Sequence, residues 1–262
     1  MNIHKASYLI AGGILILSTL ACSRGANPAP TEILSPQEVS TASVPANDPS
    51  SASGACANPY LPIVNGATWN YKLTGPIPDT FTRSILSEVE SGFTDQDIFG
   101  TGATRQGKWN CENGNLIALD PTNGNSASVN SNNVTTDFQT TESSGVTIPA
   151  TFSAGDAWTQ TTTIEGTRVI SEIQVPVKNE FSNNCKAVGI ESVTVEAGTF
   201  NAMRFDCQTI MNISISMSGN PIQTTMTLNS MNWYAENIGL VKTVATGEGL
   251  DSIIELVSYN IP

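Results

Sequence analysis

Apolar and polar residues alternate along much of the chain, which is the pattern of β-strands that bury one face. Clear examples are Ile213–Met217 and, after a turn at Ser218–Pro221, the return strand Met226–Leu228. No stretch shows helical spacing of apolar residues over more than two turns. The pattern therefore predicts an all-β protein with little helix, an antiparallel sheet arranged as a half-barrel or a sandwich. Further strands are predicted at Trp69–Leu73, Phe81–Val89 and Leu116–Leu119.

Two segments predict local detail of the strands. Val169–Val177 keeps one alternating phase, so it is expected to form a single strand. Met231 and Trp233 are out of phase with Met226–Leu228, which predicts a β-bulge near Asn229-Ser230.

The four tryptophans form two repeated motifs. Gly66–Trp69 matches Gly155–Trp158, and Trp109 and Trp233 are each followed at the same offsets by Glu, Asn and Leu. A duplicated β unit with an insertion in its second copy explains the order, although short matches between such strands also arise by chance. A glycine permits a tight turn into each strand, and the indole is expected to be buried at the sheet end rather than exposed as a stacking platform for sugars.

The charge balance excludes one class of partner. The formal net charge is −12 and Lys and Arg form no cluster, whereas a nucleic-acid partner requires a basic surface. An anionic lipid surface would also repel this chain. Contact with a membrane must therefore come from a covalent lipid.

The cysteines indicate two disulfides. Besides Cys22, the chain has Cys56, Cys111, Cys185 and Cys207, an even number that suits an exported protein. Three connectivities exist, and we favour pairing in sequence order. Loops of these lengths would stabilise the fold by roughly 4 and 3 kcal/mol.

Pairing of Cys185 with Cys207 constrains the strand register of a predicted hairpin at Val193–Phe205. A turn at Ala197-Gly198 would place Cys207 opposite Val188, three residues from Cys185. A bulge or bend near Gly189 is then needed to bring the two sulfur atoms within reach.

The N-terminus has the features of an export signal. Lys5 precedes an apolar and small-residue run that is too short to span a membrane comfortably and ends at Leu17–Cys22. This end resembles the lipobox of bacterial lipoproteins, which implies that Cys22 carries lipid after residues 1–21 are removed. Thr19 departs from the leucine usual in that motif. An ordinary secretory signal is the alternative.

Composition divides the remainder of the chain. Residues 22–55, rich in Pro, Ser, Ala and Thr, are expected to be a flexible tether, and residues 56–262 a single β-rich domain with an exposed loop at Pro121–Asn133. A lipid anchor places the protein in the cell envelope, on the outer side of the cytoplasmic membrane or at the outer membrane. Ser23 is not the aspartate that retains some lipoproteins at the inner membrane, which favours the outer one in two-membrane bacteria.

A second resemblance concerns the folded part. Tyr60–Pro62, Ala197–Phe200 and Trp233–Lys242 recur in envelope lipoproteins, some of which are similar to the LolA/LolB-like group. That resemblance implies an open half-barrel with an apolar concave face, although the helices that line the cavity of those carriers are missing here. Strand residues would line the face, or else form a sealed core; they are Ile213, Ile215, Met217, Met226 and Leu228.

Catalytic constellations are scarce. The single histidine, His4, lies in the signal, so the mature chain has neither a histidine-based triad nor a typical catalytic zinc site. Asp95–Gly100 opens like a calcium loop but lacks later ligands, and a solvated turn is the expected structure. Glu112 and Glu236, at equivalent repeat positions, could form a glycosidase pair, but exposed acids in turns are the simpler expectation.

We therefore expect no enzyme, cofactor or metal. The leading hypothesis is a lipid-anchored, non-catalytic β-rich module that binds another envelope protein or polymer, or has a structural role. The alternative is a carrier or sensor of an apolar ligand or lipid held in the concave face.

Overall fold

A computed structural model describes residues 54–119, 136–170, 173–217, 220–247, 249 and 251–262. The chain divides into two units, Met1–Ala46 and Asn47–Pro262, and every described residue belongs to the second. The predicted signal, Cys22, the tether up to residue 53 and the loop Pro121–Asn133 lie outside the described residues.

Every regular element of the described residues is a β-strand, as the alternation predicts. The twelve strands are β1 (Thr68–Thr74), β2 (Asp79–Val89), β3 (Gly92–Phe99), β4 (Thr104–Glu112), β5 (Asn115–Ala118), β6 (Thr136–Gly145), β7 (Ala157–Ile170), β8 (Ile173–Val195), β9 (Gly198–Met217), β10 (Asn220–Ala235), β11 (Gly239–Gly247) and β12 (Ser252–Asn260).

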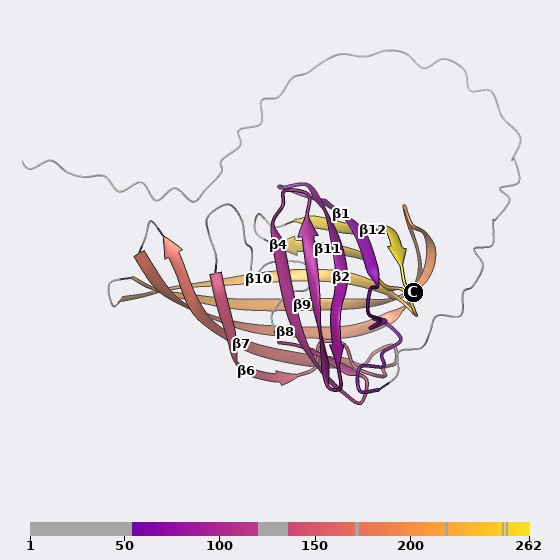
Figure 1. Cartoon of the computed structure of the whole chain (residues 1–262), viewed down its shortest axis with the longest axis horizontal. Helices are drawn as coiled ribbons and strands as arrows, with labels where there is room; N and C mark the ends of the chain where they lie inside the picture. Colours follow the sequence, from indigo (N-terminus) through magenta and orange to yellow (C-terminus); the bar gives the residue numbers. More distant parts are fainter. Residues whose placement is uncertain (1–53, 120–135, 171–172, 218–219, 248, 250) are drawn as a thin grey trace, which may run out of the picture. The chain divides into compact units, whose positions relative to one another are not determined.

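The strands form one antiparallel sheet that is nearly closed into a barrel (Figure 1). Its order is β6-β7-β8-β9-β10-β11-β12-β1-β2-β3-β4-β5, so strands adjacent in the chain are neighbours and the first strand pairs with the last. The seam lies between β5 and β6, where Leu116 forms a bridge with Ile148 just beyond β6. The predicted antiparallel, half-barrel class is therefore confirmed.

The segment Cys56–Val64 lies across one end of the barrel. Asn58 donates from Nδ2 to the carbonyl oxygens of Gly114 (2.9 Å) and Pro149 (3.0 Å), and the Pro59 carbonyl accepts from the Asn237 amide (2.6 Å). A disulfide between Cys56 and Cys111 of β4 fixes the same segment. These contacts seal a core that is rich in aromatic residues and includes Trp69, Tyr71, Phe81, Phe93, Trp109, Phe205 and Tyr234.

The first tryptophan motif is structurally repeated. Gly66 and Gly155 both have positive φ, 84° and 101°, in turns that enter β1 and β7. Each glycine amide donates to a strand one further along, to Ile85 of β2 and Ala187 of β8. This part of the proposed duplication is supported.

The second tryptophan motif is not equivalent in three dimensions. Trp109 is in the main core, whereas Trp233 belongs to a small cluster on the outer face with Val193, Ala202, Ala235 and Val241. The β4–β5 turn has two residues, whereas three residues connect β10 to β11. The two-residue period explains the difference, because Trp109 shares the inward phase of Cys111 in β4, whereas Trp233 alternates with the inward Tyr234 in β10.

Both predicted disulfides are present, and the predicted hairpin is corrected in its turn. Val195 pairs with Gly198, so the turn is Glu196-Ala197, one residue earlier than expected. A register shift between Ala187 and Gly189 then aligns Cys185 directly with Cys207. The expected bulge near Gly189 is thus confirmed.

Two other strand predictions are wrong. Val169–Val177 is a hairpin rather than one strand, because Ile170 ends β7 and pairs with Ile173, the first residue of β8. β10 runs past Asn229-Ser230 without a register shift against β9. Met231 and Trp233 change phase because the outer cluster, and not the inner core, receives Trp233.

We predict that the two disulfides stabilise the fold according to loop length. Cys56→Ala/Cys111→Ala should lower the free energy of unfolding by about 4 kcal/mol and Cys185→Ala/Cys207→Ala by about 3 kcal/mol. Guanidinium unfolding of the two variants measures both losses. A larger loss for the second pair would show that packing of the sulfurs, not loop length, sets the stabilisation.

Candidate functional site

The longest described strands extend past the closed part of the barrel. β10 pairs with β11 only from Leu228 onward, so Asn220–Thr227 lies beyond the end of β11. We call the projecting parts of four strands the extension: residues 161–170, 173–182, 209–217 and 220–228. Figure 1 shows these parts of β7, β8, β9 and β10 projecting together as a curved sheet.

The two faces of the extension differ in polarity. Its inner face continues the core-facing side of the barrel, and cross-strand pairs such as Val177 with Ile215 and Phe181 with Met211 lie on it. Its outer face is polar and includes a hollow of about 340 Å³ lined in part by Lys178, Glu180, Asn212 and Gln223. The apolar residues of the inner face are Ile164, Val175, Val177, Phe181, Met211, Ile213, Ile215, Ile222, Met226 and Leu228.

The residues predicted to line a ligand site lie on this inner face. Ile213, Ile215, Met226 and Leu228 are all half-buried there, and Met226 pairs with Met211. Met217 is the last residue of β9, and its side chain lies outside the described ones. The structure brings the four described side chains to one face, and ligand binding by them stays a prediction.

One amide interrupts the apolar inner face. Asn179 of β8 pairs with Ile164 on one side and Ile213 on the other, is only 9 % exposed, and its Oδ1 has no hydrogen-bond partner. Sequence reasoning missed it, although the signal is visible. Asn179 occupies an inward position of the alternating series that contains Val175, Val177 and Phe181.

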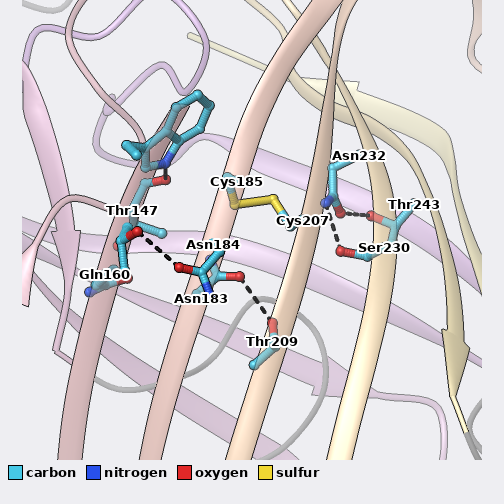
Figure 2. The surroundings of a disulfide bond; sticks show 12 residues. Thr147, Gln160, Asn183, Asn184, Cys185, Cys207, Thr209, Ser230, Asn232 and Thr243 are labelled. Carbon is cyan, nitrogen blue, oxygen red and sulfur yellow. Dashed lines mark hydrogen bonds between the residues drawn. A yellow bond between two sulfur atoms is a disulfide. The ribbon is translucent and has the colours of Figure 1, made fainter. Parts of the chain in front are cut away.

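A polar belt separates the extension from the aromatic core. Figure 2 shows the Cys185–Cys207 disulfide with hydroxyl and amide side chains of the neighbouring strands around it. Thr209 donates to the Asn183 Oδ1 (3.0 Å), and Gln160 donates to the Ala118 carbonyl oxygen (2.7 Å). On the other side of the disulfide, Thr243 donates to the Asn232 Oδ1 (2.9 Å) and Asn232 to the Ser230 hydroxyl (2.9 Å).

A buried ion network crosses β2, β3 and β4. Asp97 accepts from Arg83 Nε (2.8 Å) and Arg105 Nε (2.8 Å), and Asp95 accepts from Arg105 Nη2 (3.2 Å). All four side chains are nearly inaccessible, with Asp97 fully buried. The two arginines and two aspartates balance in charge, which makes their burial tolerable.

Burial and the ion pairs shift the pKa values of Asp97, Arg83 and the neighbouring Tyr71. Burial by itself would raise the pKa of Asp97, but the Arg83 and Arg105 guanidiniums hold it down at about 2. Burial works against the charged form of Arg83, yet Asp97 and Asp95 raise its pKa. The pKa of the fully buried Tyr71 is raised by desolvation, and its hydroxyl donates to the Leu240 carbonyl oxygen (2.9 Å).

This network corrects the interpretation of Asp95–Gly100. Asp95 and Asp97 lie in strand β3, not in a calcium loop and not in a solvated turn. The alternation of Asp95 and Asp97 with Gln96 and Ile98 placed both acids on the inner face, where distant arginines meet them. The sequence alone does not predict these ion pairs, because Arg83 and Arg105 come from two other strands.

Glu112 and Glu236 are both exposed, and each lies beside an asparagine with positive φ, Asn113 (50°) and Asn237 (62°). They flank the β4–β5 and β10–β11 turns, as the simpler expectation had it. Three of the four tryptophans, Trp69, Trp109 and Trp233, are buried, and Trp158 is half-buried against the core, as the expectation of burial at the sheet end had it.

A family model for DUF3108-like proteins matches residues 101–259, more than half of the chain. The chain belongs to the DUF3108-like family. No curated protein is similar enough to the sequence to be matched.

Two solved structures resemble this DUF3108-like chain. A candidate lipoprotein from Parabacteroides distasonis ATCC 8503 is 16% identical, with a TM-score of 0.51 over 78% of this chain and 99% of that one. A candidate exported protein with a YmcC-like fold from Bacteroides fragilis NCTC 9343 is 18% identical, with a TM-score of 0.48 over 75% and 96%. At such identities the likeness is one of fold.

The described part of this DUF3108-like chain lacks a cluster of metal ligands and a membrane-spanning helix. Its His, Cys, Asp and Glu side chains include no group of three or more that could hold a metal ion. The same residues contain no helix that is long and apolar enough to cross a membrane.

We predict that Asp97 makes the stability of this DUF3108-like domain sensitive to acid. Its folded pKa of about 2 lies below the ordinary 3.8, so its contribution is complete above pH 4 and is lost as pH falls through about 2. The loss should be about 2 kcal/mol, measured by urea unfolding between pH 5 and pH 2. Asp97→Asn should remove this pH dependence, whereas Glu88→Gln, at an exposed position, should keep it.

Proposed function

We propose that this protein is a lipid-anchored, non-catalytic envelope protein whose β-domain is a binding module. The observation that carries the proposal is the pair of disulfides, because such bonds persist in exported proteins and not in a reducing cytosol. The lipobox-like end at Cys22 supports a lipid anchor. The candidate lipoprotein of Parabacteroides distasonis, which shares the fold, gives further support.

The absence of catalysis in this proposal follows from the available groups. The only histidine of the sequence precedes Cys22, and Asp95 and Asp97 are held by arginines inside the barrel. A carboxylate with a depressed pKa and two cationic partners is a poor proton donor or acceptor near neutral pH. This supports a binding role rather than an enzymatic one.

A second candidate function is specific to the extension: it carries or senses an apolar ligand or lipid. Half-buried Ile213, Ile215 and Met226 favour it, since they lie beyond the polar belt and not in the aromatic core. Leu228, also half-buried, pairs with Thr209 of the belt and continues the same apolar face. An apolar face with a few polar groups is the usual composition of a small-molecule site. The binding module and the carrier differ in partner, not in anchoring.

We predict that Cys22→Ser abolishes acylation and moves the protein from the membrane fraction to the soluble fraction. The expected cause is the loss of the thiol that receives lipid, since the acidic domain has no affinity of its own for an anionic surface. Mass spectrometry of the N-terminal peptide, with fractionation of the cells, measures both effects. Ser23→Ala, which leaves the thiol intact, is the matched control, and membrane retention of Cys22→Ser would contradict the anchor.

We predict that Met226→Asp weakens binding of an apolar fluorescent probe at least about tenfold, because a carboxylate would have to be desolvated beside the ligand. Thr227→Asp adds the same charge to the opposite, exposed face of the same strand and should leave the affinity unchanged. Both variants are made in the mature Cys22→Ser chain, which needs no detergent. Equal effects of the two substitutions, or no probe binding at all, would count against the carrier.

A further inference from the structure

Asn179 is the one amide at the centre of the apolar inner face among the described side chains. Its neighbours across the sheet are Ile164 and Ile213, and Val177 and Phe181 flank it along β8 on the same face. Its side chain is more than nine-tenths buried, yet Oδ1 accepts no hydrogen bond. A buried carbonyl oxygen without a donor is destabilising relative to an apolar side chain of the same size.

The surroundings of this oxygen define what would satisfy it. The four nearest side chains of the inner face are hydrocarbon and offer no donor: Ile164, Ile213, Val177 and Phe181. Thr162, the nearest hydroxyl residue of β7 on this face, is paired with Phe181 and not with Asn179. The nearest charged residues in sequence, Lys178 and Glu180, are on the outer face, exposed and paired with each other (2.9 Å). A group that met Oδ1 would therefore have to donate a hydrogen bond. It would also have to be uncharged, because none of the described side chains of the inner face could act as its counter-ion.

We infer that the inner face of the extension selects an uncharged apolar molecule that carries a hydrogen-bond donor, a hydroxyl or an amide N–H. Asn179 is the residue that accepts the hydrogen bond of this donor. The inference rests on the proposed carrier function and names its ligand class. The hydrocarbon part lies along Phe181, Met211, Ile213 and Met226, and the donor meets Asn179 Oδ1. A donor-less ligand of the same length would leave that oxygen unpaired, which is how a buried polar group gives specificity.

The test compares four ligands with one oleyl chain on the mature Cys22→Ser protein. Oleyl alcohol and oleamide carry a neutral donor, methyl oleate only accepts, and oleate is an anion. Displacement of the apolar probe should give dissociation constants for the alcohol and the amide that are about tenfold lower than for the ester and for oleate.

The deciding variant is Asn179→Leu, which replaces the amide with a hydrocarbon of similar size. It should bind methyl oleate at least as well as the parent protein, lose the preference for the alcohol, and unfold at a higher temperature. Asn212→Ala, at an exposed outer position of β9, is the matched control and should keep the preference.

The experiment distinguishes failure of this inference from failure of the carrier function. If all four ligands bind the parent protein equally well, or if Asn179→Leu keeps the preference for the alcohol, the inference is overturned while the carrier function stands. If none of the four binds, the carrier function and the inference fall together. Circular dichroism of each variant confirms that it is folded before binding is measured.

Discussion

Pairing of the first strand with the last is the constraint on which the rest of this structure depends. Seven residues of β1 pair with β12, so a meander whose neighbours in sequence are neighbours in space bends back on itself. A sheet that closes has an inside and an outside, and the two-residue period of a strand then assigns every side chain to one of them. The seam between β5 and β6 is the only interruption among the described strands, and it too is bridged, at Leu116 and Ile148.

The closed part of the barrel contains more than hydrocarbon. At one end, Cys56–Val64 and the aromatic side chains form an apolar core. Beyond it, buried charges must be balanced, and two arginines, Arg83 and Arg105, face two aspartates, Asp95 and Asp97. The balance of charge is complete, whereas Asp95 Oδ1 and Arg105 Nη1 have no hydrogen-bond partner. Such a network stabilises little compared with apolar packing, but removal of one partner leaves a buried charge. Its value is that it fixes the relative positions of β2, β3 and β4.

The extension differs from the closed part of the barrel in the polarity and burial of its two faces, and the proposed carrier function rests on this difference. Its inner face is apolar but half-buried, and its outer face is polar. A sheet that needed only to seal the barrel could end where β11 ends. Strands that continue past their neighbours with an apolar inner face are what the proposed carrier function requires. Asn179, whose Oδ1 has no hydrogen-bond partner, is the residue proposed to make binding at this face selective.

The sequence by itself determined the all-β class of the fold and indicated two disulfides, with pairing in sequence order as the favoured one of three connectivities. These follow from local alternation and from the number and spacing of cysteines, which need no knowledge of distant contacts. It even indicated the bulge near Gly189, because the register of Cys185 and Cys207 required it.

Only the tertiary structure decided which apolar residues face inward. Trp109 and Trp233 share a motif but lie on opposite faces, since Trp109 is in the inward phase of β4 and Trp233 in the outward phase of β10. Tertiary structure likewise decided the role of Asp95 and Asp97, which were expected in a solvated turn and are instead buried ion-pair partners, because arginines from two other strands meet them. The identity of a partner across a sheet is set by register, and register is a property of the whole closed sheet, not of any one segment.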